Sequence, residues 1–144
     1  MISAPDQQRL RDAFSEMTRS VRLVFFTQTL GCETCVQARQ ILDELPPLSD
    51  RITIEEVNLV LDADKVTQYG VDRAPSIAVV AHDDAGDHET RIRFAGTPSG
   101  YEFSSLIHAV MIAGGRPTSL TDAQRQRLAA IDRPVTLQVF TTPT

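Results

Sequence analysis

The sequence predicts a three-layer α/β/α sandwich around a sheet of mixed parallel and antiparallel strands. Two short and almost continuously apolar runs, at residues 21–26 and 76–82, are typical of strands that are buried on both faces. Segments whose apolar residues recur at helical spacing alternate with these runs. A length of 144 residues, without repeats or low-complexity tracts, suits a domain with a sizeable core.

The first half of the chain is expected to alternate between helices and strands. Ser3 is placed to cap the first helix, because its hydroxyl can accept a hydrogen bond from a free amide of the first turn. A proline disfavours helical backbone in the residue before it, so Pro46 ends the second helix. The expected elements are a helix at 4–19, a strand at 21–26, a helix from the Cys32–Cys35 segment to the residue before Pro46, and a strand at 52–58.

The second half is expected to hold a hairpin between two helices. Gly70 closes a short helix, and the turn-forming residues 83–87 predict the hairpin. The expected elements are a helix at 62–69, a strand at 76–82, a hairpin partner at 91–94, and a helix from Gly100 to Gly114. A parallel β-α-β unit followed by an antiparallel hairpin and a last helix predicts a thioredoxin-like fold.

Residues 117–144 are expected to lie outside this unit. A capping box from Thr121 to Gln124 predicts a helix that extends to Ile131, and the alternating residues 135–140 predict a strand. Because a strand needs a partner, we expect 135–140 to join the edge of this unit's sheet, to pair with another copy as a dimer, or to be poorly ordered. The expected division is a thioredoxin-like unit at 1–116, then a linker helix and the first strand of a second, truncated unit at 117–144.

Composition argues against several function classes. A net charge of −5 and a pI near 5.1 argue against nucleic acid as the main partner. No apolar stretch approaches the ~20 residues that a membrane span needs, and the first residues lack the apolar core of a secretory signal. We therefore expect a cytoplasmic protein that binds neither nucleic acid nor membrane.

Two cysteines carry the candidate chemistry, in the sequence Gly31-Cys32-Glu33-Thr34-Cys35. A bridge across two residues closes too small a loop to restrain the unfolded chain, which excludes a structural disulfide framework. A structural zinc site would need two more ligands from histidines that lie far along the chain, and an inert pair of buried thiols also stays open. The position of the pair between a buried strand and a helix favours a redox dithiol, with no metal and no bound cofactor.

Thiol–disulfide exchange begins with a thiolate, so one cysteine must ionise readily. We expect Cys32 at the N-terminus of the helix, where free amides and the helix dipole favour the thiolate, and we assign it as the attacking group. Cys35, one turn further and buried, is the expected resolving thiol. Glu33 and Thr34 are expected to tune the pair, since an acid beside Cys32 opposes its ionisation. The alternative that Glu33 is an ordinary solvated acid of the first helical turn also stays open.

Pro75 directly precedes the buried strand at 76–82 and is the second candidate element. In a thioredoxin-like fold this proline is cis and packs against the cysteine loop, which leaves the backbone of Ala74 free to pair with an extended substrate segment. A trans proline at the entry of a strand is the alternative. Phe26 is expected in the core, so no proton-shuttling acid is assigned six residues before Cys32. Of the other side chains, Tyr101 is expected to pack and Arg93 to face solvent.

Four stretches carry a resemblance to a known family: the strand with GCETC and its helix, residues 71–75, residues 94–103, and residues 131–144. The chain resembles the first thioredoxin-like unit of the two-unit protein disulfide oxidoreductases, also called glutaredoxin-like proteins. Residues 93–117 are also similar to the N-terminal domain of the flavoprotein component of alkyl hydroperoxide reductase, whose first unit lacks the CxxC.

The resemblance implies a thiol–disulfide oxidoreductase that exchanges disulfides with protein substrates and is recharged by a thioredoxin-reductase-type flavoprotein. Two alternatives stay open: a structural or docking unit that supports a second CxxC unit, and an electron shuttle to a peroxiredoxin. The Glu33-Thr34 dipeptide and the missing second half depart from the family pattern. In the family, the residue after Thr144 would be the first cysteine of the second unit.

Overall fold

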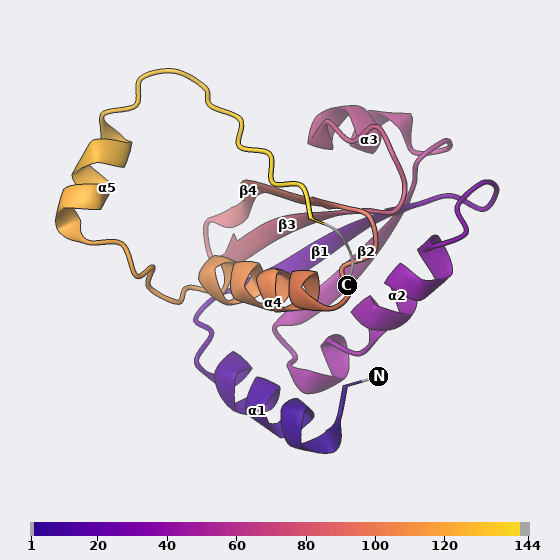
Figure 1. The fold of residues 1–144 in the computed structure, drawn as a ribbon, viewed down its shortest axis with the longest axis horizontal. Helices are drawn as coiled ribbons and strands as arrows, with labels where there is room; N and C mark the ends of the chain where they lie inside the picture. The colour runs from indigo at the N-terminus through magenta and orange to yellow at the C-terminus, as the bar shows by residue number, and fades with distance from the viewer. Residues whose placement is uncertain (1, 142–144) are drawn as a thin grey trace.

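A four-stranded mixed sheet, with strand order β2-β1-β3-β4, forms the centre of the molecule (Figure 1). The computed structural model describes residues 2–141. Strand β1 pairs with β2 in parallel and with β3 antiparallel, and β3 pairs antiparallel with β4. The elements are α1 (Ala4–Ser15), β1 (Ser20–Thr27), α2 (Cys35–Asp43), η1 (Pro46–Leu48), β2 (Ile52–Asn58), α3 (Ala63–Tyr69), β3 (Ser76–Asp83), β4 (Gly86–Ala95), α4 (Tyr101–Ala113) and α5 (Asp122–Ala129). This order confirms the predicted α/β/α sandwich.

Strand β1 is buried on both faces, as its continuous apolar run predicts. Val21, Leu23 and Phe25 join a core cluster with residues of α1, α2 and α4. Val24 and Phe26 join a second cluster on the opposite face, with Tyr69 of α3. Side chains alternate across a strand, so one strand supplies both cores and fixes which helices cover which face.

The end of α4 is locked against the loop between α1 and β1. The amide of Thr18 donates to the carbonyl of Gly114 at 2.8 Å. A Cβ at Gly114 would lie 2.6 Å from Cε of Met17, so a larger residue here would force the Met17 side chain to move. Gly115 follows with φ of +105°, a backbone conformation that residues with a side chain rarely adopt.

Strand β4 differs most from the sequence prediction. It runs from Gly86 to Ala95, whereas the alternation of residues predicts only 91–94. Backbone pairing with β3 continues through polar residues, and the register shifts between Ala78 and Val80 where Arg91 adopts φ of +61°. This irregularity breaks the alternation that the prediction depends on.

Polar side chains gather on the α3 side of the sheet, where a solvent-facing Arg93 was expected. Its guanidinium carbon instead lies 5.3 Å from the centre of the Tyr69 ring, and its Nε donates to the Tyr69 carbonyl at 3.1 Å. Helix α3 has only seven residues, and the side chain of Arg93 helps to cover Tyr69 at its end. The prediction that Arg93 faces solvent is wrong, because only 25% of its side chain is exposed.

Residues beyond α4 make little contact with the sandwich. The predicted capping box between Thr121 and Gln124 is confirmed, and it opens α5. The strand predicted at 135–140 is wrong for the single chain, because these residues form neither helix nor strand and are exposed. None of the described strands pairs with them. Pairing of residues 135–140 with another copy stays a prediction. Residues 142–144, which the sequence assigns to the same second unit, lie outside the described residues.

We predict that removal of residues 117–144 leaves the free energy of unfolding within about 0.5 kcal/mol of the full chain, because the described residues of this segment, 117–141, bury almost no side chain. Chemical denaturation of both chains, followed by circular dichroism, measures it. A loss of several kcal/mol would show that the segment belongs to the folded unit.

We also predict that Leu42→Ala lowers the free energy of unfolding by about 2–5 kcal/mol, because Leu42 anchors α2 in the core with no exposed surface. Leu137→Ala is the matched control at an exposed position and is expected to change stability by less than about 0.5 kcal/mol. Equal effects of the two substitutions in denaturant titrations would contradict the packing described for α2.

Candidate functional site

Cys32 and Cys35 form a disulfide in the turn that joins β1 to α2, with 5.4 Å between their Cα atoms. The helix begins at Cys35, so it starts within the CxxC as expected, and Cys32 lies three residues before its first residue. Residues 33 and 34 form the turn, and the amide of Cys35 bonds to the carbonyl of Cys32 at 3.4 Å. The free amides of the first helical turn and the positive end of the helix dipole still lie at this turn.

The two cysteines differ in accessibility. Cys35 is only 5% exposed and belongs to the core below α2, whereas Cys32 is half-buried. The sulfur of a partner protein can therefore approach Cys32. Cys35 is placed to react with the sulfur of Cys32 within the same chain. This asymmetry favours the roles assigned from the sequence, with Cys32 attacking and Cys35 resolving.

Three loops meet at the end of the sheet that carries the disulfide. Strand β1 ends there, β3 begins there, and β4 ends there, as the register of Phe26 with Ser76 and of Ser76 with Ala95 requires. The hydroxyl of Thr97 donates to the carbonyl of Thr34 at 3.3 Å, and the amide of Gly96 donates to the carbonyl of Pro75 at 2.8 Å. Thr34 thus helps to anchor the cysteine turn to the loop after β4, while Glu33 is exposed.

The loop before β3 supplies the second candidate element. Pro75 is buried, its bond to Ala74 is cis, and Ala74 packs against the same core cluster as Cys32. The described part of the chain provides no hydrogen-bond partner to the Ala74 backbone. An extended peptide could therefore pair with this backbone as an added strand does.

An ion pair stands just before this loop. Nε of Arg73 lies 2.7 Å from Oδ1 of Asp72, and both side chains are exposed. The hydrogen bond from Arg73 holds the pKa of Asp72 below its usual range. Asp72 thus keeps its negative charge beside Ala74 over the neutral pH range.

The interior near the cysteines is apolar. Phe26 is fully buried, as predicted, and its ring meets that of Tyr69 edge to face at 5.7 Å between centres. Apart from the hydroxyl-bearing Tyr69, Ser76 is the one buried polar residue in the described part of the chain. No described carboxylate is therefore buried where it could accept a proton from Cys35.

The zinc alternative meets a geometric obstacle. His82 pairs with Ser20 at the start of β1, whereas the cysteines follow its end, so His82 lies at the opposite end of the sheet. His82 and His88 bond to Asp87 and Asp83, each at 2.8 Å, across the hairpin turn. The described residues contain no group of three or more histidine, cysteine or acidic side chains arranged to hold a metal ion.

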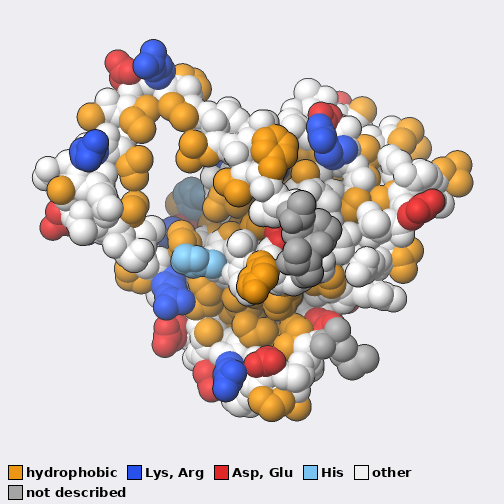
Figure 2. Space-filling model, in the orientation of Figure 1, with side chains coloured by type: hydrophobic (Ala, Val, Ile, Leu, Met, Phe, Trp, Pro, Cys, Tyr) orange, Lys and Arg blue, Asp and Glu red, His pale blue; other side chains and the backbone are white. Residues whose placement is uncertain are grey.

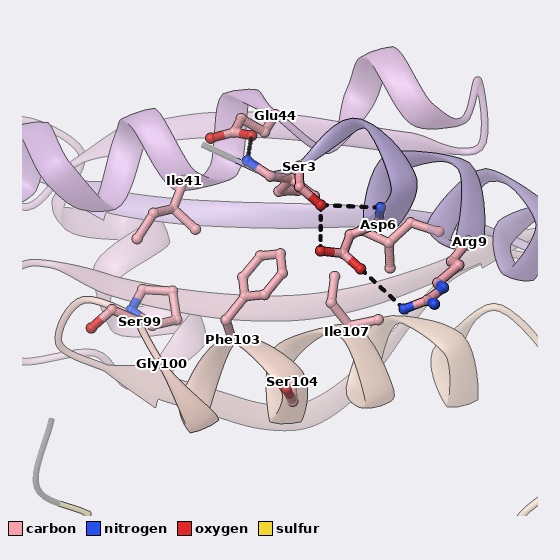
Figure 3. Close-up of a pocket in the computed structure, with 13 residues that line it drawn as sticks. Ser3, Asp6, Arg9, Ile41, Glu44, Ser99, Gly100, Phe103, Ser104 and Ile107 are labelled. Carbon is pink, nitrogen blue, oxygen red and sulfur yellow. Dashed lines mark hydrogen bonds and ion pairs between the residues drawn. The ribbon is translucent and has the colours of Figure 1, made fainter. Parts of the chain in front are cut away.

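A groove of about 700 Å³ lies between α1, α2 and α4, away from the disulfide (Figure 3). Ile41, Phe103 and Ile107 point into it, and Asp6 on its rim bonds to Ser3 and Arg9. The sequence predicts these apolar residues as core, and the hollow arises because the three helices do not close over them. It shares the 98–100 loop with the disulfide end.

Exposed apolar side chains near the disulfide differ from the sequence prediction. Tyr101 was expected to pack, yet it is 86% exposed at the start of α4. Leu30 and Leu61, on the loops after β1 and β2, are exposed to a similar degree.

None of the helices in the described part of the chain combines the length and apolar character that a membrane crossing would need.

Comparison with known proteins finds curated relatives, although no protein-family model matches the chain. The AhpF component of alkyl hydroperoxide reductase in Staphylococcus epidermidis is 27% identical over 141 residues, which cover 97% of this chain and 24% of that protein. The AhpF of Staphylococcus aureus is 28% identical over 134 residues, or 92% of this chain and 22% of that protein. The chain therefore spans about a quarter of the length of these curated relatives.

Solved structures show the same fold. The N-terminal domain of alkyl hydroperoxide reductase AhpF from Enterococcus faecalis superposes with a TM-score of 0.81 at 27% identity, covering 92% of this chain and 62% of that one. A protein disulfide oxidoreductase from Aeropyrum pernix gives 0.74 at 23% identity, covering 89% and 54%. A thioredoxin from Trichomonas vaginalis gives 0.51 at 20% identity, covering 71% and 88%.

The chain thus has a thioredoxin-like fold, and it is similar to the N-terminal domain of AhpF and to a protein disulfide oxidoreductase, as the sequence motifs indicate. At less than 25% identity, the last two structures support the fold alone. A thioredoxin-like fold with a bridged CxxC pair is consistent with thiol–disulfide oxidoreductase chemistry.

We predict that limiting iodoacetamide labels Cys32 several-fold faster than Cys35 in the reduced native chain, because the Cys35 side chain is enclosed by the core. Peptide mass spectrometry after short exposures measures the ratio. In denaturant, where both thiols are accessible, the difference is expected to shrink. Equal native labelling would contradict the unequal burial of the two sulfurs.

Proposed function

We propose that this chain is a module for thiol–disulfide exchange with protein substrates, which uses Cys32 and Cys35 as its reactive pair. The observation that carries the proposal is the bridged pair itself, with one half-buried and one enclosed sulfur beside the buried Pro75. A bridge that served stability alone would gain little, because it closes a loop of only two intervening residues.

The reaction transfers two electrons from the dithiol to a substrate disulfide. The thiolate of Cys32 attacks one substrate sulfur, a Cys32–substrate bond forms, and the substrate's own S–S bond breaks. The first substrate thiolate leaves and takes a proton from solvent. Cys35 then loses its proton and attacks the Cys32 sulfur, which releases the second substrate thiolate and restores the Cys32–Cys35 bridge. The reverse sequence oxidises a substrate dithiol.

Residues around the cysteine pair position the substrate and determine where the proton of the Cys35 thiol can go. The Ala74 backbone pairs with an extended segment on one side of the substrate disulfide. Thr34 holds the cysteine turn through its bonds to Thr97 and to α2. Because the interior at Phe26 is apolar, the Cys35 proton passes to solvent or to the departing substrate thiolate.

Reduction of the bridge requires a donor. The similarity to the AhpF of an alkyl hydroperoxide reductase, over 97% of this chain, supports a redox flavoprotein of the thioredoxin reductase type as electron source. The same similarity supports a peroxide-reducing partner of the peroxiredoxin type as one acceptor. Such recycling belongs in a reducing compartment such as the cytoplasm.

A second candidate is a structural or docking role for the chain within a longer redox protein. It is favoured by the apolar side chains of residues 135–140, which are exposed beyond a folded unit that does not use them. In this case Cys32 and Cys35 would add little to the rate of disulfide reduction, so an exchange assay separates the two roles.

We expect the chain to accelerate reduction of insulin by dithiothreitol, and Cys32→Ser to return the rate to that of dithiothreitol alone, because no attacking thiolate remains. Turbidity of the precipitating insulin B chain measures the rate. Leu137→Ser, an exposed position distant in sequence from the pair, serves as the matched control and is expected to keep full activity. Equal sluggishness of the wild type and Cys32→Ser would reject the exchange function and favour the docking role.

A further inference from the structure

Large apolar side chains are exposed around the disulfide end of the sheet. We define the apolar rim as Leu30, Val36, Val60, Leu61 and Tyr101, whose exposures run from 67% to 86%. On the described folded unit, large exposed apolar side chains are confined to these loops and helix starts. Further exposed apolar side chains lie in the C-terminal segment. Exposed apolar groups that gather at one place mark interaction sites more often than isolated ones do.

The fold places the members of the apolar rim at one end of the molecule. Strands β1 and β2 run in parallel, with Thr27 opposite Asn58, so the loops that carry Leu30 and Val60 leave the sheet side by side (Figure 1). The amide of Leu59 donates to the carbonyl of Thr27 at 2.8 Å and joins the two loops directly. The bond between Thr97 and Thr34 brings the loop before Tyr101 to the same end.

Val60 and Leu61 are held outward by a hydrogen-bonded turn. The side-chain oxygen of Asn58 accepts from the amides of Val60 and Leu61, at 2.9 and 3.1 Å. The carboxylate of Asp62 accepts from the amide of Asn58 at 2.7 Å. A turn fixed at three amides cannot easily rotate to bury its two apolar side chains, so the exposed pair is available to a partner without rearrangement.

The charges around the apolar rim are mostly negative. The two basic groups on these loops and on the start of α3 are paired with acids, Lys65 with Glu55 and Arg73 with Asp72. The acidic residues of the same segments are Glu33, Asp62, Asp64, Asp72 and Glu102. Figure 2 shows hydrophobic side chains at the right-hand end of the visible face, with acidic side chains among them and a basic side chain next to an acidic one above.

We infer that the apolar rim docks a polypeptide whose disulfide is flanked by apolar and basic side chains. The inference rests on the proposed exchange function and names its substrate class. The apolar side chains of the partner cover Val60 and Leu61 and its basic side chains face the surrounding carboxylates, while its extended backbone meets Ala74. Hydroxyethyl disulfide has neither large apolar flanks nor a charge, so it is expected to react without help from the apolar rim.

The test measures single-turnover oxidation of the reduced full chain by three disulfides. These are a synthetic peptide whose disulfide is flanked by leucine and lysine, the same peptide with glutamate for lysine, and hydroxyethyl disulfide. The double variant Val60→Ser/Leu61→Ser removes the apolar pair, and Leu137→Ser/Val139→Ser removes an equally exposed pair elsewhere as the matched control. Stopped-flow measurements at low and high salt give the second-order rate constants.

The lysine peptide is expected to react fastest with the wild type, with an advantage over the glutamate peptide that falls as salt screens the carboxylates. Val60→Ser/Leu61→Ser is expected to slow the lysine peptide roughly tenfold, as partial loss of two buried aliphatic contacts implies, and to leave hydroxyethyl disulfide unchanged. The control variant is expected to match the wild type with all three probes.

Three results would overturn the inference: equal peptide rates for the two double variants, no preference for the lysine peptide, or an equal slowing with hydroxyethyl disulfide. The last result would mean that the substitutions disturb the cysteines rather than docking. Failure of the wild type to react with any of the three disulfides would instead reject the proposed exchange function, so the two failures are distinguishable.

Discussion

The site depends on the burial of β1 between two cores. Val21, Leu23 and Phe25 face one layer, and Val24 and Phe26 face the other, so the strand cannot shift by one residue without exchanging both sets. This constraint fixes where β1 ends, and therefore where the cysteine turn leaves the sheet. The partner strand β3 begins, and β4 ends, at that same level, which brings the Pro75 loop and the Thr97 loop to the turn.

Three residues of separation give the two sulfurs different surroundings. Cys35 is the first helical residue and enters the core with α2, whereas Cys32 remains in the turn outside it. In the proposed exchange, reactivity toward partners therefore follows from where the helix begins, and not from a dedicated acid or base, since the neighbouring interior at Phe26 is apolar. The proposed docking at the apolar rim then selects partners by apolar contact and charge.

Much of the fold could be predicted because its signals are local. The run at 21–26, the cap at Ser3 and the capping box at Thr121 each depend on neighbouring residues, and the structure confirms them. The length of β4 and the covering of Tyr69 by Arg93 depend on distant pairing, which no local pattern reports. The candidate site was predictable as a motif, whereas the apolar rim was not, since exposure of a valine or leucine is decided by tertiary structure.

Trapping of a mixed disulfide tests the central claim most directly, namely that Cys32 meets the substrate and Cys35 resolves the product. Cys35→Ser, incubated with a protein disulfide substrate, should accumulate a covalent complex through Cys32 that is visible by non-reducing electrophoresis and by mass spectrometry. Cys32→Ser should accumulate almost none. A complex that forms equally well through Cys35, or no complex with either variant, would contradict the assignment.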